Sequence, residues 1–387
     1  MKTKTILLCL LCLSMAACWK APGGSATTHE GDTIQLKYAQ KLTFVKHKEY
    51  TEVKLSDPWN IGKTLHTYLL VPHDAQLPEH LPQGTVIRTP VRRAVISTSV
   101  HCGLADQLGQ REAVKGVCDV QYIHLPWMQE RVKNGTVKDC GSALQPTLET
   151  IIDLQADAIF LSPFQNSGGY GRLEKIGIPI VEMADYMETS ALGRAEWMRF
   201  YGMLFDAGKQ ADSLFSKVEK NYLDLKAQAD RCSAVAPSKK PSVLMDKLTG
   251  SVWYVPGGKS TIGRIIIDAG ADYPWADDGQ SGSLPLPFES VFEKGLNCSV
   301  WLFRYNSPQA VTPQALLAEN KGYSQFRAFR EGEIYGCNTA TSTFYEDTPF
   351  HPDLLLRDFI TIAHPELGLG EPRYFIKAKG ENEKLGK

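Results

Sequence analysis

Apolar and polar positions follow two different rhythms along this chain. Close to the N-terminus, the segments 41–47 (KLTFVKH), 51–57 (TEVKLSD) and 67–72 (TYLLVP) place apolar side chains at alternate positions or in short runs, which predicts antiparallel strands. From residue 94 onward, short apolar runs such as 94–99 (AVISTS) and 156–163 (ADAIFLSP) alternate with loops and helical segments. This second rhythm is typical of βαβ units on a parallel sheet.

A long helical repeat interrupts the α/β rhythm. Between residues 206 and 234 the apolar side chains recur at helical spacing, and four lysines fall largely outside that face. If 208–232 is one helix, its length is about 37 Å. A second α/β set follows it, with strands predicted in 242–248 (SVLMDKL), 299–305 (SVWLFRY) and 333–338 (EIYGCN).

We therefore predict an α/β protein with two Rossmann-like lobes and one long, rigid interdomain α-helix. The N-terminal lobe is expected at 32–205 and includes a β-rich extension, the helix at 206–234, and the C-terminal lobe at 235–387. The sequence does not show what the extension, residues 32–90, contributes to function.

Composition and charge narrow the class of protein. The 387 residues are 43% hydrophobic and 22% charged, as expected for a soluble globular body with a core. Forty-two basic and 43 acidic residues give a formal charge of −1. A nucleic-acid-binding protein usually has a marked basic excess, so we expect no nucleic-acid partner.

The first residues predict export and a lipid anchor. Two lysines, an apolar run and small residues ending in SMAAC have the layout of a signal peptide, 1–17, followed by Cys18 as the lipidated residue. An ordinary secretory signal cleaved nearby is the alternative. Residues 18–31 are small and polar, which favours a flexible tether. We expect a monomer in the cell envelope, held to a bacterial membrane on its periplasmic side.

Six cysteines remain after Cys18 and the signal peptide are set aside. An exported protein can form disulfides, but these six are widely and irregularly spaced, and no CxxC pair occurs among them. We expect buried free thiols; a Cys118–Cys140 bridge is the alternative.

Familiar catalytic and metal-binding motifs are missing from the chain. It contains no GxSxG elbow, no GxxxxGK[ST] phosphate loop and no HExxH motif, and GGYGRL at 168–173 lacks the GxGxxG spacing. The nine histidines form no short-range ligand pair. We therefore predict neither a catalytic site, nor a required cofactor, nor a dedicated metal site.

Polar and aromatic residues collect where predicted strands end. Ligands of open α/β sheets bind beyond the carboxyl ends of the strands, so these residues are candidates to line a cleft between the lobes. Core or loop anchoring is the alternative for the aromatic residues, and a structural role for the histidines. Arg304 suits an anionic group of a ligand. The candidates are His101, Gln165, Asn166, Tyr170, Arg172, Tyr186, Trp253, Trp275, Arg304, Tyr305, Tyr345 and His351.

One arrangement occurs twice. Glu149 follows Pro146 and precedes a short amphipathic segment and a strand, and Glu289 follows Pro287 and precedes the same elements. An acid in the first turn of a helix is favoured by the helix dipole in any protein, by about 0.3–1 kcal/mol. The repetition suggests two lobes of related architecture.

Several segments together resemble a known family. The stretches 92–119, 148–161 (LETIIDLQADAIFL) and 282–303 (GSLPLPFESVFEKGLNCSVWLF) resemble substrate-binding proteins of ABC importers for iron chelates and cobalamin. The similarity runs from about residue 92 to 369. It implies a bilobal fold with a rigid helix and small lobe movements. It also implies one exposed glutamate on each lobe, here Glu149 and Glu289, that docks onto arginines of the membrane permease.

The resemblance leaves the cargo open. It implies capture of a metal chelate and delivery to an ABC permease with its ATPase, without catalysis. We rank an iron chelate, either a siderophore or haem, ahead of cobalamin, and His101 is then a candidate axial ligand to the metal. The alternatives are a haem-processing envelope enzyme and a surface sensor that has no permease partner.

Overall fold

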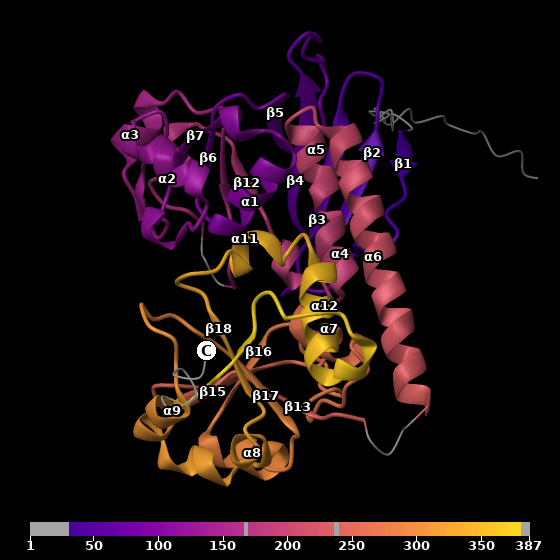
Figure 1. Ribbon diagram of the computed structural model, residues 1–387. Coiled ribbons are helices and arrows are strands. Elements are labelled where there is room, and N and C mark those ends of the chain that lie inside the picture. Colours follow the sequence, from indigo (N-terminus) through magenta and orange to yellow (C-terminus); the bar gives the residue numbers. More distant parts are fainter. Residues whose placement is uncertain (1–30, 166–168, 236–239, 381–387) are drawn as a thin grey trace, which may run out of the picture.

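A computed structural model gives the architecture of the chain. It describes residues 31–165, 169–235 and 240–380, so Cys18 and the predicted signal peptide lie outside the described residues. Two α/β lobes lie one above the other in Figure 1, and one long helix runs along their side. The predicted fold class is confirmed.

The N-terminal extension forms a sheet of its own. Its order is β1-β2-β3-β4-β5, antiparallel except for the parallel β4–β5 pair, and the three strands predicted here are among its members. The strands are β1 (Asp32–Ile34), β2 (Leu42–Lys46), β3 (Thr51–Ser56), β4 (Thr64–Pro72) and β5 (Thr85–Thr89).

Two buried carboxylates tie this extension to the N-terminal lobe. Glu196 accepts hydrogen bonds from the backbone N–H groups of Tyr38 and Ala39, at 2.7 and 2.9 Å, and Glu188 accepts one from Lys41 at 2.8 Å. Both glutamates are fully buried. Several backbone donors compensate for the burial of each charge. The extension is thus part of the lobe rather than an appendage.

The N-terminal lobe is built on a parallel sheet of order β12-β11-β6-β7-β8. Its strands are β6 (Ala94–Ile96), β7 (Val114–Val117), β8 (Lys138–Asp139), β11 (Ala158–Leu161) and β12 (Ile180–Glu182), with a small hairpin of β9 (Gly141–Ser142) and β10 (Gln145–Pro146). The α-helices between them are α1 (Ser99–Gln107), α2 (Pro126–Lys133) and α3 (Leu148–Asp153). The segment before β12 contains a short 3-10 turn, Glu174–Ile176.

One continuous helix, α6 (Gly208–Val235), covers the segment predicted at 206–234. Its 28 residues extend over about 42 Å. Ala211, Phe215, Val218 and Tyr222 form its buried face, as the helical repeat predicted. It packs against α5 (Met198–Leu204), which follows α4 (Ala191–Glu196), and farther along against α12 (Pro352–Ala363) of the other lobe. The helix therefore contacts both lobes.

The C-terminal lobe has a sheet of order β13-β17-β18-β19, in which only β19 is antiparallel, and a smaller antiparallel sheet β14-β15-β16. The strands are β13 (Val243–Met245), β14 (Leu248–Thr249), β15 (Val252–Pro256), β16 (Ser283–Leu286), β17 (Val300–Tyr305), β18 (Ile334–Asn338) and β19 (Ile376–Lys377). The remaining α-helices are α7 (Thr261–Asp268), α8 (Phe288–Gly295), α9 (Pro313–Glu319), α10 (Arg327–Arg330) and α11 (Phe344–Asp347).

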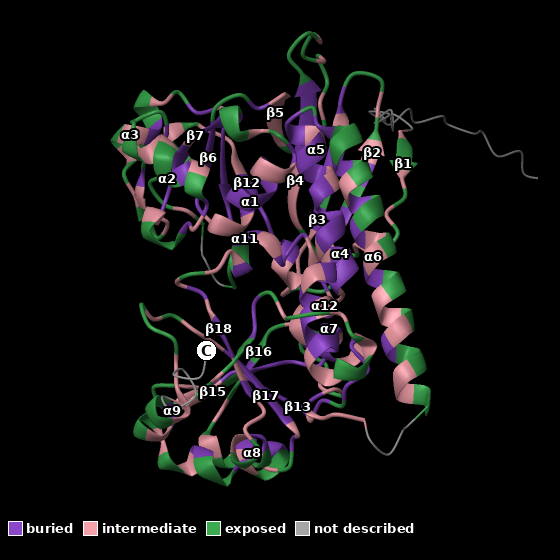
Figure 2. Ribbon diagram, viewed as in Figure 1, coloured by how far each residue is buried: buried purple, intermediate pink, exposed green. Residues whose placement is uncertain are grey.

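Buried residues are concentrated in the strands and along the inner helix faces (Figure 2). All six cysteines of the described residues are free thiols, and only Cys232 is not buried, so the expectation of free thiols is confirmed and Cys118–Cys140 is not a bridge. Within the described ranges, no helix has the length and apolar character needed to cross a membrane.

Candidate functional site

Two helices that follow strands of different lobes meet as a pair. Helix α1 begins three residues after β6 ends, and α11 follows β18 of the other lobe. The two helices pack directly against each other, and Figure 1 places this contact between the lobes. At Gly103 of α1 a side-chain carbon would overlap the backbone carbonyl of Glu346 in α11. Only glycine permits so close an approach.

The side chain of Glu346 also reaches into the N-terminal lobe. It is 1% exposed, and its Oε1 accepts a hydrogen bond from the backbone N–H of His124 at 2.7 Å. Burial raises the pKa of the Glu346 carboxyl above its ordinary value, although the His124 N–H opposes this shift. A carboxyl group thus lies enclosed at the junction of the lobes.

A buried ionic cluster stands behind α1. His101 Nε2 lies 3.2 Å from Asp185 Oδ1, and Arg194 Nε donates to Asp185 Oδ2 at 2.8 Å. The other ring nitrogen of His101 pairs with Thr98 Oγ1 at 3.0 Å. Burial alone would raise the pKa of Asp185, but the Arg194 charge and the His101 ring hold it below its ordinary value.

The cluster corrects the prediction for His101. The side chain is 1% exposed and both ring nitrogens already have partners, so it is neither a cleft contact nor an axial ligand in this structure. Its position directly after a strand suggested the cleft, yet the ring turns into the lobe. His101 is a structural residue here.

In the C-terminal lobe, Arg304 extends from the end of β17 and forms a bidentate pair with Asp246, with N···O distances of 2.9 and 2.5 Å. Its side chain is 25% exposed. Burial disfavours the charge, but the Asp246 carboxylate raises the pKa of Arg304 above its ordinary value. The guanidinium is therefore partly neutralised before any ligand arrives.

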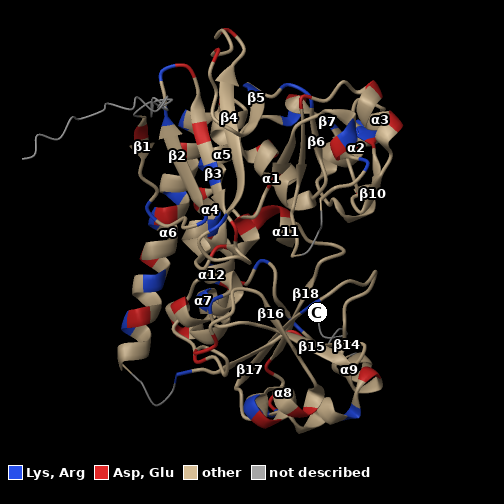
Figure 3. Cartoon of the chain, turned by 180° about the vertical axis from the view of Figure 1, so that it is seen from behind, with Lys and Arg blue, Asp and Glu red and all other residues tan. Residues whose placement is uncertain are grey.

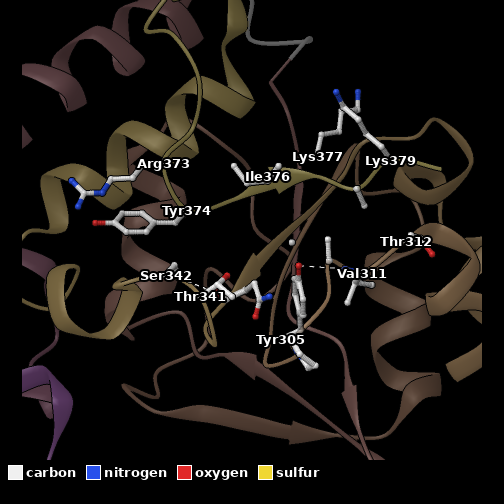
Figure 4. Close-up of a pocket in the computed structure, with 15 residues that line it drawn as sticks. Tyr305, Val311, Thr312, Thr341, Ser342, Arg373, Tyr374, Ile376, Lys377 and Lys379 are labelled. Carbon is white, nitrogen blue, oxygen red and sulfur yellow. Dashed lines mark hydrogen bonds between the residues drawn. The ribbon is translucent and has the colours of Figure 1, made fainter. Parts of the chain in front are cut away.

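A cavity of about 560 Å³ opens beside this region (Figure 4). Its walls come from the ends of β17 and β18 and from the C-terminal segment around β19. Tyr305 and Asn338 supply polar groups, and the cationic residues of the wall are Arg373, Lys377 and Lys379. Two of these cations are already paired with carboxylates, Lys377 with Glu333 at 2.7 Å and Arg373 with Asp347 at 2.8 Å. This volume suits a small-molecule ligand, and the charges favour an anionic one.

The cavity wall is connected to the helix pair. Arg373 donates to Asp347 Oδ2 at 2.8 Å, and the hydroxyl of Tyr374 donates to the same oxygen at 2.9 Å. Asp347 is the last residue of α11. A ligand that displaced Arg373 would therefore act directly on the element that contacts α1.

The other candidate ligand residues of the N-terminal lobe, and Tyr345 of the C-terminal lobe, differ in how far they are exposed to solvent. Tyr345 of α11 is 42% exposed, Gln165 and Arg172 are exposed, and Tyr186 is half-buried with its hydroxyl donating to Pro163 O at 2.5 Å. Asn166 lies outside the described residues.

Three candidates do not line this cavity, and the two tryptophans among them are buried. Trp253 is fully buried, and its indole N–H donates to Met245 O at 2.9 Å within a cluster of aromatic rings. Trp275 is 5% exposed and packs against the Tyr273 ring. His351 precedes α12, with Nδ1 3.5 Å from Asp353 Oδ1. These side chains stabilise the lobe and do not line the cavity.

Tyr170 faces a different cavity, of about 570 Å³, between the N-terminal extension and β12. Its hydroxyl donates to Glu182 Oε1 at 2.6 Å, and His66 Nδ1 lies 2.9 Å from Glu182 Oε2. Tyr170 was predicted to line the same cleft as the other residues at strand ends, but it lines a separate cavity of the N-terminal lobe.

Sequence reasoning missed the cationic residues of the C-terminal segment. Arg373, Lys377 and Lys379 follow the last helix in a stretch with no strand-like repeat, and β19 is only two residues long. Its pairing with β18 brings them to the cavity. No local signal in the sequence announces that pairing.

The two repeated glutamates occupy equivalent places. Glu149 is in the first turn of α3 and Glu289 in the first turn of α8, and both side chains are exposed. Within the part of the chain that the structure describes, neither makes an ion pair. Figure 3 shows α3 and α8 on separate lobes, each with acidic positions marked in red.

The two-lobed fold with a side helix is that of a binding protein, and comparison with known families agrees. The family model described as "Periplasmic binding protein" matches residues 103–341. The chain belongs to this family, and its members bind solutes. The resemblance found in the sequence is confirmed at that level.

Two curated relatives are both uncharacterized lipoproteins of the archaeon Methanocaldococcus jannaschii. One is 24% identical over 372 residues, covering 90% of this chain and 86% of the relative; the other is 24% identical over 356 residues, covering 89% and 87%.

Solved structures share the fold at low identity. A protein of an Fe3+-hydroxamate transport system from Saccharomonospora viridis has a TM-score of 0.54 at 17% identity, with 70% of this chain and 93% of that chain covered. A molybdate-binding protein from Haemophilus influenzae gives 0.58 at 18%, covering 72% and 88%. A heme-binding protein from Pseudomonas aeruginosa gives 0.56 at 15%, covering 75% and 99%.

Proposed function

We propose that this protein is the binding component of an ABC importer and that it captures an iron chelate, a siderophore or haem, between its lobes. The observation that carries the proposal is the contact between α1 and α11, which follow strands of different lobes, next to a cavity of about 560 Å³ whose walls come from the C-terminal lobe. Binding proteins place their ligands at the ends of strands.

The chemistry of the cavity supports an anionic chelate. Lys377 and Lys379 project in the same direction in Figure 4, and Arg373 extends from the same segment. Tyr305 offers a ring to a ligand of mixed character. Carboxylates of haem or oxygen donors of a siderophore would match the positive groups. Two similar solved structures are those of an Fe3+-hydroxamate transport system protein and a heme-binding protein.

Glu149 and Glu289 are proposed to dock onto the permease. Both are exposed, each is in the first turn of a short helix, and they are on different lobes. A membrane partner that carries two arginine sites could contact both lobes at once.

We further propose that Cys18 carries the lipid and that residues 18–31 tether the body to a membrane of the cell envelope. The sequence layout before Cys18 supports this, and two relatives are named as lipoproteins. Several acyl chains give a stable anchor, because each buried CH₂ contributes about 0.8 kcal/mol.

A calorimetric titration of the purified protein tests the cargo. The panel is haem, a ferric hydroxamate, a ferric catecholate, cobalamin and molybdate. We expect one iron chelate to bind tightly at one equivalent and to be recovered chemically unchanged. Cobalamin binding alone would replace the proposed cargo, and steady release of iron from haem would indicate an enzyme.

A matched pair of tyrosine variants locates the site. Tyr305→Ala removes a ring from the cavity and should weaken chelate binding at least tenfold. Tyr254→Ala removes a 47% exposed ring of β15 that is not part of the cavity wall and should leave the affinity unchanged. Equal effects of the two substitutions would place the ligand elsewhere.

A further inference from the structure

Three potential metal ligands converge at the far end of the interdomain helix. Cys232 lies in the last turn of α6, His364 directly follows α12, and Glu366 lies in the 3-10 turn Pro365–Leu367. One ligand atom from each of the three residues lies within 4.8 Å of the other two. Cys232 Sγ is 2.7 Å from Glu366 Oε1, and His364 Nδ1 is 3.4 Å from the same oxygen.

The imidazole ring of His364 is buried, and outside the cluster its ring nitrogens have no hydrogen-bond partner among the described residues. His364 is 4% exposed, and its backbone N–H donates to Ile360 O at 2.7 Å. Its Nε2 is buried and has no hydrogen-bond partner among the described residues. Buried polar atoms of native proteins nearly always have partners. Nδ1 is the ring nitrogen on the side of the cluster, 3.4 Å from Glu366 Oε1, so with the ring proton on Nε2 its lone pair can bind a cation there.

A glycine closes the other side of the ring. Gly270, at the end of α7, has a φ of +72°, and a side-chain carbon there would lie 3.0 Å from His364 Nε2. Ser233, next to Cys232, donates its hydroxyl to the carbonyl of Gly270 at 3.0 Å. These contacts fix the end of α6 and the ring of His364 relative to each other, which is how a ligand set is preorganised.

The donor set selects the kind of cation. Thiolate, imidazole and carboxylate together suit Zn²⁺, whereas Mg²⁺ and Ca²⁺ prefer oxygen ligands only. Zinc–ligand distances of about 2.0–2.3 Å place tetrahedral ligand atoms about 3.5 Å apart. The 3.4 Å between His364 and Glu366 already fits, and the thiol–carboxylate pair must open by about 1 Å. Glu366, 59% exposed, has room for that movement.

We propose that Cys232, His364 and Glu366 form a zinc site, with solvent in the fourth position, that fastens the end of the interdomain helix to the last helix of the C-terminal lobe. The site is far from the α1–α11 contact, because the end of α6 lies at the opposite side of the lobe in Figures 1 and 3. The ion is thus a structural component of the protein and not its cargo.

Cobalt(II) titration of the metal-free full-length protein tests the site. We expect one equivalent to produce the near-ultraviolet thiolate-to-cobalt charge-transfer band and the visible bands of a tetrahedral ion, and Zn²⁺ to abolish both. Zn²⁺ should also raise the melting temperature, because it binds the folded state only. An absence of binding at millimolar Co²⁺ and Zn²⁺ would overturn the proposal.

Variants assign the ligands. Cys232→Ser should remove the charge-transfer band and, like Glu366→Gln, weaken Zn²⁺ binding at least tenfold; both side chains reach the surface, so folding should persist. His80→Ala removes an exposed histidine outside the site and should change nothing. An unchanged band in Cys232→Ser would show that another cysteine binds the ion and that the assignment is wrong.

Discussion

The charge of Asp185 depends on two neighbours, because its side chain is 1% exposed. Replacing Arg194 by methionine would leave a buried carboxylate with only His101 beside it. We expect Arg194→Met to reduce the free energy of unfolding at pH 7 by about 3 kcal/mol, as is typical when one partner of a buried ion pair is removed. Urea unfolding followed by circular dichroism measures the loss.

The pH dependence of the stability loss distinguishes loss of the ion pair from a general disturbance of packing. The folded-state pKa of Asp185 lies below its ordinary value of 3.8, so its stabilising contribution is present above that value and is lost as the pH falls through the folded pKa. Without Arg194, burial raises that pKa, so the variant should lose more stability at pH 7 than at pH 4. Arg92→Met, an exposed control, should be neutral at both. A loss of equal size at both pH values contradicts the argument.

Single residues are also where prediction from the sequence is weakest. His101 and Tyr305 both stand beside the end of a predicted strand, yet His101 is buried against Asp185 and Tyr305 lines a cavity. Trp253 belongs to a strand of the small sheet and points into the lobe. The alternation along a strand shows which side chains share a face. It does not show whether that face is covered by a helix, by another sheet or by solvent, because the covering element comes from elsewhere in the chain.

Among the elements, the contact of α1 with α11 is the most sensitive to size. A Cβ at Gly103 would overlap the carbonyl of Glu346, so the two lobes must separate or the helices must shift. We expect Gly103→Ala to reduce the free energy of unfolding by about 2 kcal/mol, as overpacking of a close contact does. Chemical denaturation measures this change.

A second glycine provides the control for that substitution. Gly208 opens α6, and a Cβ there meets no atom within 4 Å. Gly208→Ala should therefore be neutral or slightly stabilising, because alanine restricts the unfolded chain. If Gly103→Ala unfolds at the same denaturant concentration as Gly208→Ala, the interlobe contact is looser than the structure shows.

Elements with a long repeat or a long apolar run could be predicted, and short ones could not. Helix α6 shows its repeat over 28 residues, and β17 is a buried run of apolar residues, so local patterns suffice for both. Helix α11 has four residues and β19 has two, and their conformations depend on packing against α1 and pairing with β18. The cavity is lined in part by β19, so it could not be assembled from the sequence.

At the scale of the whole molecule, the helix that connects the lobes limits how far Glu149 and Glu289 can move relative to each other. Helix α6 packs against α5 of one lobe and α12 of the other. The distance between Glu149 and Glu289 then changes little unless α6 bends or one of these contacts slides. If the proposed permease contacts both glutamates, its binding depends on the relative position of the lobes. The proposed ligand would affect that position through the hydrogen bond between Arg373 and Asp347 of α11.

This arrangement leads to a prediction for transport. The double variant Glu149→Ala, Glu289→Ala should bind the chelate with unchanged affinity, because both side chains are exposed on α3 and α8 and neither lines the cavity. Uptake into vesicles that contain the cognate permease should fall at least tenfold, because both charge-assisted contacts with arginine are lost.

The same helices provide a control of equal charge change. Asp153 on α3 and Glu293 on α8 are also exposed acids, each four residues after the glutamate proposed to dock. Since residues four apart share a helix face, Asp153→Ala with Glu293→Ala removes the same charge from nearly the same surface. This control should retain most of the uptake. If both double variants transport equally well, or fail equally, the effect belongs to the general acidity of the two lobes, and the assignment of docking to Glu149 and Glu289 is wrong.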